Sequence, residues 1–237
     1  MPIPTAPARK PGLLKTLRSW VVSFAMAFAI LAPLRSAIAD WNDVPTGSME
    51  PTILVGDRIF VNKLAYGLRV PFTHSWIAQW SNPGSGDIVV LNSPKDGVRL
   101  VKRLIAGPGD TIALANNVLT INGQAQPYTA VLDSTLHTIP GDVRQGRQFA
   151  SEHLRGHAHL VAAIPAIGSA KRDFGPITLP PNQYFVMGDN RDNSADSRYF
   201  GFVDRRLIVG RSSAVAISVD PKNYYLPRLG RWFMGLD

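Results

Sequence analysis

The stretch Arg99-Leu-Val-Lys-Arg-Leu-Ile105 decides the fold class expected for this 237-residue chain. It is short and rich in branched apolar residues, and the turn residues Gly107-Pro-Gly-Asp110 follow it, which is the pattern of a β-strand. Period two places Lys102 on the same face as Leu100 and Leu104. The strand therefore carries a lysine amine toward an apolar face of a sheet.

Similar runs occur on both sides of this strand, each bounded by Gly, Pro, Asn or Asp. They cover residues 58–62, 87–91, 111–114, 118–121, 184–187, 207–210 and 214–219. After residue 45 no long pattern of period 3.6 is present, so helices are not expected to form the core. The sequence predicts a mostly β domain built on an antiparallel sheet.

Residues from about 125 to 180 have a poor apolar pattern and contain four of the five histidines, so we predict a smaller inserted subdomain there. His157 and His159 could face the same way on a strand as metal ligands. No third ligand stands near them in the sequence. We therefore expect a solvent-exposed pair, and neither a metal nor another cofactor.

Composition and charge limit the classes of partner. Apolar residues make up 45% of the chain, which is enough for a core, and the net charge is +8 with a pI of about 10.0. A net positive charge favours binding to either nucleic acid or anionic lipid. We expect membrane lipid as a partner and no nucleic acid. The absence of cysteine excludes disulfides and thiolate zinc sites.

The N-terminal segment is typical of a membrane anchor, because basic residues precede an apolar run at 20–34 and no acidic residue occurs before Asp40. A helix of that run would span only roughly 22 Å, so crossing the hydrocarbon core requires continuation to Ala39, with Arg35 reaching the headgroups. The basic residues predict a cytoplasmic N-terminus. The predicted divisions are a cytoplasmic tail at 1–18, a transmembrane anchor at 19–39 and an extracytoplasmic domain at 40–237.

A cleavable secretory signal is the alternative for this segment. Ala37-Ile-Ala39 before Asp40 has the small residues of a cleavage site. Both alternatives export the rest of the chain, so the topology is the same in either case.

A candidate nucleophile stands in Pro45-Thr-Gly-Ser-Met-Glu-Pro51, where two prolines enclose a bend that presents Ser48 outward. Its hydroxyl needs a base, because a free hydroxyl is almost wholly protonated at neutral pH. Glu152-His153 could supply a histidine, although it lies in the region of poor pattern. A lysine kept neutral by burial is the other option, and the strand pattern offers both Lys102 and Lys63.

A dense polar run, Gly188-Asp-Asn-Arg-Asp-Asn-Ser-Ala-Asp-Ser-Arg198, directly follows the apolar strand at 184–187. Such a run cannot continue a core. Its Asp and Asn side chains favour a compact loop that bonds to its own backbone. The acids and arginines at this spacing predict a loop that locks a site.

Four motifs, taken in order, resemble those of the type I signal peptidases, the bacterial leader peptidase family of Ser-Lys dyad serine peptidases. They are Pro45-Thr-Gly-Ser-Met-Glu-Pro-Thr52, Gly56-Asp-Arg-Ile-Phe-Val-Asn-Lys63, Lys102-Arg103 with Gly107-Pro-Gly-Asp110, and the polar run at 188–198. The resemblance covers the anchor and most of residues 45–125 and 183–220. The region at 125–180 falls where this family varies.

The resemblance implies roles at the matching positions. Ser48 would be the nucleophile and Lys102 the general base, which decides between the two lysines. Thr46 stands where many family members have a serine, and its hydroxyl would form the oxyanion hole together with the Ser48 amide. The remaining implied roles are a base-orienting Ser194 and structural salt bridges of Asp189 with Arg103 and of Asp196 with Arg198.

The implied function is that of a membrane-bound serine endopeptidase that removes N-terminal signal peptides from exported preproteins after small residues of the Ala-x-Ala type, through an acyl-enzyme. The implied location is the bacterial inner membrane, with a single span and the peptidase domain outside the cytoplasm. A specialised conjugative-transfer peptidase that matures a pilin has the same residues and is one alternative. A membrane-anchored binding module without catalysis is another.

Two segments outside the motifs are rich in aromatic residues. Residues 70–80 contain Phe72, Trp76 and Trp80, and residues 228–234 combine arginines with Trp and Phe. This composition is typical of a membrane interface, so we expect both segments to contact lipid. Core packing is the alternative for the first segment.

Overall fold

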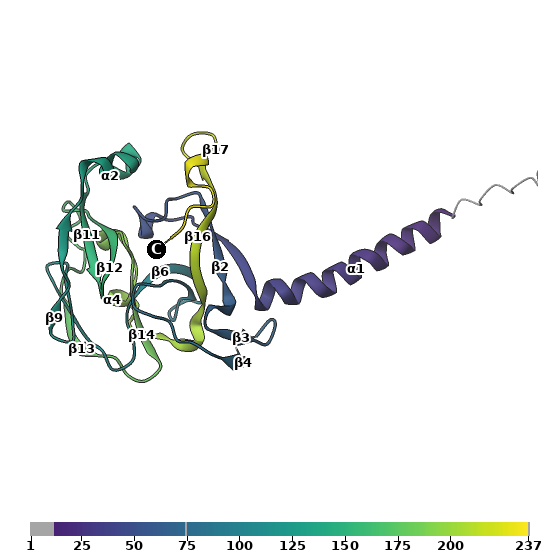
Figure 1. The fold of residues 1–237 in the computed structure, drawn as a ribbon, viewed down its shortest axis with the longest axis horizontal. Coiled ribbons are helices and arrows are strands. Elements are labelled where there is room, and N and C mark those ends of the chain that lie inside the picture. The colour runs from purple at the N-terminus through teal and green to yellow at the C-terminus, as the bar shows by residue number, and fades with distance from the viewer. Residues whose placement is uncertain (1–11, 74, 237) are drawn as a thin grey trace, which may run out of the picture.

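The main element of the structure, a computed structural model that describes residues 12–73 and 75–236, is a curled antiparallel sheet (Figure 1). Its strands, in spatial order, are β1 (Ala39–Asp43), β2 (Asp57–Asn62), β16 (Ile208–Asp220), β5 (Ile88–Asn92), β6 (Arg99–Ala106), β14 (Gln183–Met187) and β15 (Val203–Asp204), and β17 (Leu226–Pro227) pairs with β16. Strand β5 is buried on both faces, since Ile88 and Val90 belong to one hydrophobic cluster and Val89 and Leu91 to another. The prediction of a mostly β fold is confirmed.

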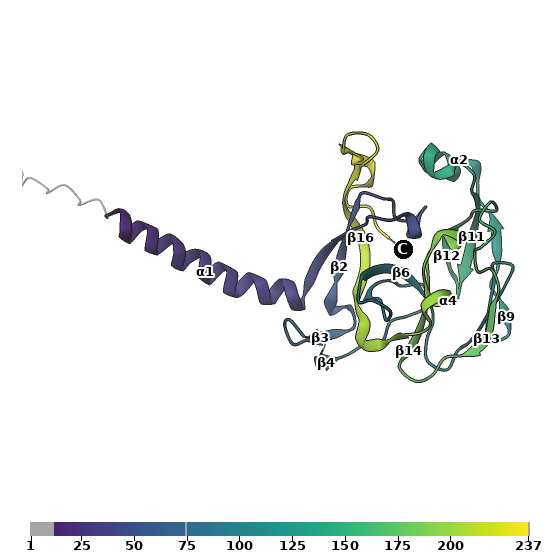
Figure 2. The same cartoon turned by 180° about the vertical axis from the view of Figure 1, so that it is seen from behind.

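Two smaller sheets form the part of the domain that lies away from helix α1 (Figures 1 and 2). One contains β13 (Phe174–Thr178), β7 (Thr111–Ala115), β8 (Val118–Ile121) and β9 (Gln124–Ala125), and the other contains β10 (Tyr128–Ala130), β11 (Gln148–Leu154) and β12 (His157–Ala163). Two short helices, α2 (Asp133–Thr138) and α3 (Gly141–Arg144), connect β10 to β11. The sheet of β10, β11 and β12 lies in the region where an inserted subdomain is predicted, and it is called the inserted subdomain below, whereas β13 pairs with β7.

Strand β16 corrects one prediction. Residues 207–210 and 214–219 are expected as separate strands because a polar stretch lies between them, but residues 208–220 form one strand. The polar stretch stays extended because β2 and β5 pair with it from either side: Arg211 faces Asn62 of β2 and Val89 of β5. Shifts in register, one of them between Ser212 and Ala214, interrupt the ladder locally and let the strand bend.

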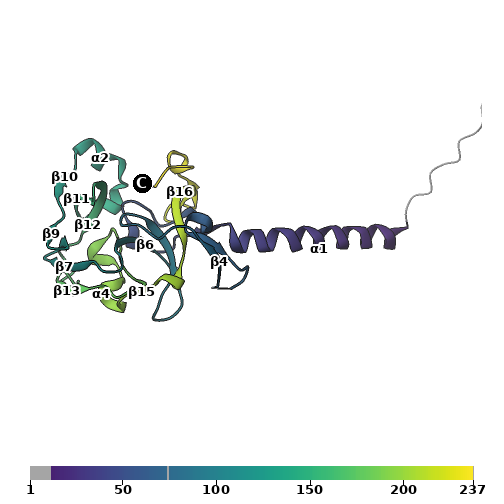
Figure 3. The same ribbon diagram turned by 60° about the horizontal axis from the view of Figure 1, so that its bottom comes forward.

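Helix α1 (Leu13–Ala37) projects from the domain (Figures 1 and 3). Its 25 residues measure about 37 Å at the usual rise, which is enough to cross a bilayer core. The segment Thr16–Ala37 has a mean hydropathy of 1.7, and an 18-residue stretch within it has no buried residue, so its length and composition fit a membrane span. The helix ends at Ala37 and Ala39 already belongs to β1, two residues inside the predicted anchor. Of the predicted tail, residues 1–11 lie outside the described residues.

A small hairpin follows β2 and lies beside the base of α1 (Figure 1). It consists of the 3-10 turn η2 (Lys63–Ala65), β3 (Gly67–Arg69) and β4 (Trp76–Gln79). Phe72 and Trp80 are exposed, as a membrane contact requires. Trp76 is not, because it packs between the guanidinium groups of Arg69 and Arg205, at 4.2 and 4.6 Å from its ring centre. For Trp76 the alternative of core packing is correct.

Residues 228–234 lie farther from α1 than this hairpin, next to β17 (Figures 1 and 3). They include the turn η5 (Leu229–Arg231), in which Leu229 is exposed. The chain then runs back along β16, where the Met234 carbonyl accepts a hydrogen bond from the backbone N–H of Val215 at 2.8 Å. This segment therefore packs partly on the sheet.

Candidate active site

Ser48 lies in a single 3-10 turn, η1 (Gly47–Met49), between β1 and β2. A Cβ atom on Gly47 would lie 2.6 Å from a carboxylate oxygen of Glu50, so a larger residue here would displace the Glu50 side chain. Asn190 holds the turn from the other side. Its Nδ2 donates to the Gly47 carbonyl at 2.9 Å and its backbone N–H donates to the Ser48 carbonyl at 3.1 Å.

The Lys102 amine is the direct partner of the Ser48 hydroxyl. Nζ lies 2.6 Å from Ser48 Oγ and donates to the Val101 carbonyl at 3.0 Å, and Lys102 is only 2% exposed. Burial lowers the pKa of Lys102 to about 8, although Asp196 and Asp189 act in the opposite direction. An amine with this pKa is partly neutral near pH 7–8, and the neutral form can accept a proton from the hydroxyl.

The loop that follows β14 approaches Ser48 through Gly188. A Cβ atom at this position would lie 2.3 Å from the Ser48 carbonyl oxygen and 2.3 Å from Ser194 Oγ, so only glycine permits the approach. Ser194 therefore lies next to Gly188 and close to the Ser48 turn. Its buried hydroxyl makes no hydrogen bond with any described residue, Lys102 included.

Asp189 joins three parts of the chain. It accepts hydrogen bonds from Arg103 Nε and Nη2, both at 2.9 Å, and from Thr52 Oγ1 at 2.6 Å. Burial alone would raise the pKa of Asp189, but the Arg103 guanidinium holds it below its ordinary value. Because Arg103 follows Lys102, this contact ties the strand of the amine to the loop after Ser48.

Asp196 and Arg198 form a second ion pair with no exposed side-chain surface. Arg198 Nε and Nη2 each donate to an Asp196 oxygen at 2.8 Å. Asp196 also caps helix α4 (Ser197–Phe200) and accepts a hydrogen bond from the Gly188 N–H at 3.1 Å. The pair therefore fixes the polar loop from within.

Thr46, Ser48 and Lys102 line one cavity of about 400 Å³. Its walls come from β1, the turn after it and the first half of β6, and Leu100 is one of the apolar residues that line it. Thr46 is exposed, and its hydroxyl makes no hydrogen bond with the described residues. A bound group in this cavity can contact the Ser48 hydroxyl and the Thr46 side chain.

The inserted subdomain contacts the polar loop through a buried acid. Glu152 of β11 accepts a hydrogen bond from Arg191 Nη1 at 2.7 Å, and Arg191 belongs to the 3-10 turn η3 (Arg191–Asn193). His159 Nε2 lies 3.1 Å from Glu152 Oε2, so the expectation of an exposed pair is wrong for His159, which is 7% exposed. The reason is that β12 packs against η3. Of the predicted pair, only His157 is exposed.

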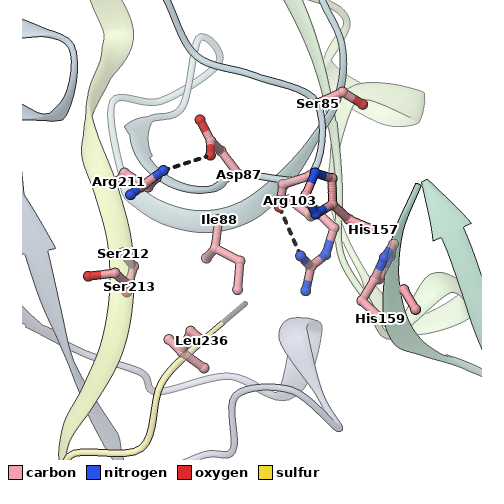
Figure 4. Close-up of a pocket in the computed structure, with 12 residues that line it drawn as sticks. Ser85, Asp87, Ile88, Arg103, His157, His159, Arg211, Ser212, Ser213 and Leu236 are labelled. Carbon is pink, nitrogen blue, oxygen red and sulfur yellow. Dashed lines mark hydrogen bonds and ion pairs between the residues drawn. The ribbon is translucent and has the colours of Figure 1, made fainter. Parts of the chain in front are cut away.

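A second cavity, of about 300 Å³, is lined by Arg103 rather than Lys102 (Figure 4). His157 and His159 line it from β12, and Arg211, which lies 3.4 Å from Asp87, lines it from β16 (Figure 4). It shares no residue with the cavity at Ser48. His153, the predicted histidine alternative for the base, lines neither cavity, and its Nε2 lies 3.2 Å from Thr129 Oγ1.

The other lysine of the strand pattern is also separate from Ser48. Lys63 Nζ donates to the carbonyl oxygens of Arg35 and Ser36, at 3.0 and 3.1 Å, and pairs with Asp40 at 3.2 Å. The structure therefore brings together Ser48, Lys102 and Thr46, with the ion pairs of Arg103 and Arg198 behind them, and leaves Lys63 at the end of α1.

Sequence reasoning missed two contacts that hold the Ser48 turn. Asn190 lies in the quoted polar run, so its position was visible, but nothing in the pattern indicates that it bonds the turn. Glu50 pairs with Arg147 at 2.8 Å across 97 positions of the chain. Arg147 lies in the region of poor apolar pattern, and no sequence signal points to it.

Comparisons with known proteins agree with this geometry. Residues 17–217 match the family described as signal peptidase, peptidase S26. The chain is 35% identical to signal peptidase I of Pseudomonas aeruginosa over 88% of its own length and 76% of the relative's. It is 33% identical to signal peptidase I S of Bacillus subtilis (85% and 89%) and 32% identical to signal peptidase I of Aquifex aeolicus (85% and 85%).

Proposed function

This chain belongs to the signal peptidase family, peptidase S26, and we propose that Ser48 and Lys102 are the nucleophile and general base of its reaction. The chain is a serine peptidase that removes signal peptides from preproteins. The observation that carries the assignment is the 2.6 Å contact between Ser48 Oγ and the buried amine of Lys102. No other lysine among the described residues makes a hydrogen bond to this serine.

The proposed reaction begins when neutral Lys102 accepts the Ser48 proton as Oγ attacks the scissile carbonyl. The Ser48 amide and the Thr46 hydroxyl then donate to the developing oxyanion. Lys102 returns the proton to the leaving amine, which leaves an acyl-enzyme on Ser48. A water deprotonated by Lys102 hydrolyses the ester and releases the signal peptide.

The substrate is proposed to bind as an added strand. Within the described residues β1 pairs only with β2, and residues 99–102 of β6 pair only with β5. Both open edges line the cavity that contains Ser48. An extended peptide between them would place alternate side chains in the cavity, where Leu100 and its neighbours leave room for small residues such as alanine.

The proposed cellular location is inferred from helix α1. We propose a single span through the bacterial inner membrane, with a cytoplasmic N-terminus and the peptidase domain at 40–237 outside the cytoplasm. The length and exposure of α1 support the span, and basic residues on its N-terminal side support the orientation. Lipid contact by the β3–β4 hairpin would keep the cavity near the surface where signal peptides emerge.

Removal of either member of the dyad should abolish cleavage without loss of the fold. We expect Ser48→Ala and Lys102→Met each to lower kcat by roughly 10⁴-fold or more, because nucleophile and base act as a unit. The measurement is cleavage of a preprotein in detergent, with circular dichroism as the check of folding. Lys95→Met, at an exposed lysine, is the matched control. A folded Lys102→Met enzyme with normal kcat would refute the assignment.

Cleavage should increase with pH through the pKa of Lys102. Only the neutral amine can act as the base, so with a pKa of about 8 the rate at pH 6 should be roughly 100-fold below its plateau. The pH profile of kcat/KM tests this. A midpoint near pH 6.5 would instead indicate a histidine.

Loss of the Thr46 hydroxyl should lower kcat more than it changes KM. Thr46→Val removes the donor and keeps the shape, so we expect kcat to decrease by roughly 10²- to 10³-fold. Thr46→Ser keeps the donor and should retain most of the activity. Equal activity of the two variants would show that this hydroxyl does not stabilise the transition state.

Membrane contact by the β3–β4 hairpin can be tested on residues 40–237. Replacing Phe72, Ile77 and Trp80 by serine should weaken binding to anionic liposomes by roughly tenfold or more, since each is exposed and apolar. Leu132→Ser is the control, because Leu132 is 73% exposed and belongs to the inserted subdomain. Equal loss in the control, or no loss in the triple variant, would contradict the proposed contact.

A further inference from the structure

Helix α1 and the wall of the Ser48 cavity are joined almost directly. The helix ends at Ala37 and β1 begins at Ala39, so only Ile38 lies between them. Residues 41–43 of β1 line the cavity that contains Ser48. The height and angle of this cavity relative to the anchor therefore depend on the contacts made at the joint.

Lys63, at the end of β2, makes the main contacts at this joint. Its Nζ donates to the carbonyl oxygens of Arg35 at 3.0 Å and of Ser36 at 3.1 Å, and its backbone N–H donates to the Ile38 carbonyl at 3.0 Å. Carbonyl groups in the last turn of a helix lack partners within the helix and carry partial negative charge. Lys63 therefore donates hydrogen bonds to carbonyl groups at the C-terminal end of α1 that have no partner within the helix.

Asp40 extends these contacts to the cavity. Its carboxylate lies 3.2 Å from Lys63 Nζ and 3.6 Å from Arg99 Nη1, and it accepts a hydrogen bond from Arg35 Nε at 3.0 Å. The side chains of Lys63 and Asp40 are only 10% and 13% exposed, so solvent screens their attraction weakly. Arg99 begins β6 and lines the cavity. One cluster therefore joins α1, β1, the turn η2 that follows β2, and β6.

The hairpin beside α1 adds a further contact. The backbone N–H of Phe72 donates to Ser36 Oγ at 2.7 Å. Ser36 thus contacts Lys63 through its carbonyl and the hairpin through its hydroxyl. The last turn of the helix is held on two sides, which is the arrangement of a rigid joint rather than of a flexible linker.

From these contacts, and on the premise that Ser48 and Lys102 are the dyad, we propose that Lys63 is a positioning residue that clamps the catalytic cavity at one height and angle relative to the membrane anchor. A signal peptide inserted in the same bilayer as α1 has its scissile bond at a depth set by its own apolar segment. The clamp holds the catalytic cavity at the depth where the scissile bond lies. A peptide free in solution has no such restraint and should not depend on Lys63.

The experiment uses the full-length chain in liposomes and two kinds of substrate. One is a soluble peptide that contains the cleavage site without an apolar segment. The other is a set of membrane-inserted preproteins with apolar segments of roughly 7 to 15 residues. Lys63→Met should leave kcat/KM for the peptide within about twofold and lower it for the preproteins by roughly 10- to 100-fold, because small displacements of the reacting groups are costly. The range of apolar-segment lengths that the enzyme cleaves efficiently should also widen.

Controls separate this proposal from the proposed function. Lys95→Met should cleave both substrates normally, and Ser48→Ala should cleave neither. Cleavage by Ser48→Ala would refute the dyad and with it the premise of the clamp. An equal loss on peptide and preprotein in Lys63→Met, or no loss on either, would overturn the clamp. Should Lys63→Met not fold, Lys63→Gln, which keeps an N–H donor group but loses the charge, applies the same comparison.

A structural measurement tests the clamp without any activity. Because the chain has no cysteine, spin labels can be attached at Ser23→Cys on α1 and Gln124→Cys on β9, both exposed. Distances between the labels in nanodiscs should form one narrow distribution in the parent chain and a broad one with Lys63→Met. An unchanged distribution would overturn the proposal.

Discussion

A lysine amine buried beside a serine hydroxyl is the interaction on which the rest of this structure depends. Lys102 is 2% exposed, and its burial lowers the pKa to about 8 from an ordinary value of 10.5. This shift disfavours the charged form by about 3 kcal/mol. The domain must therefore supply an apolar wall on one side and hold the Ser48 turn against the amine on the other.

The two ion pairs behind Ser48 and Lys102 serve the same requirement. Asp189 and Asp196 both raise the affinity of the Lys102 amine for its proton, and an unpaired carboxylate there would favour the ammonium still more. Each acid is paired with an arginine, Asp189 with Arg103 and Asp196 with Arg198. We interpret the pairs as both structural and electrostatic: they hold the polar loop and offset the charge of its acids.

The remainder of the fold brings distant parts of the chain to this point. The Ser48 turn is held by Asn190 of the polar loop and, through Glu50, by Arg147 of the inserted subdomain. The subdomain contacts the same loop through Glu152 and Arg191. The helix at the other end meets the cavity wall through Lys63. Membership of the signal peptidase family fits this arrangement, since a helix long and apolar enough to span a membrane adjoins the cavity.

The sequence by itself determined the fold class, the family and the order of the motifs. Alternating apolar runs separated by turn residues predict strands because these signals are local, and the run that precedes Asp40 predicts a span for the same reason. Local signals also failed in identifiable places. Polar residues at 211–213 indicated a break in β16, and His159 was expected to be exposed, because the strands that pair with β16 and the turn η3 that packs on β12 are remote in sequence.

Only the tertiary structure decided which polar groups meet. Strand alternation treats Lys63 and Lys102 alike, and the fold separates them, placing one at the end of α1 and the other 2.6 Å from Ser48. The physical reason is that a pKa and a hydrogen bond depend on burial and on atoms within a few ångströms. Those atoms come from positions up to 143 residues away, as in the contact of Asn190 with Gly47, so no periodicity along the chain encodes them.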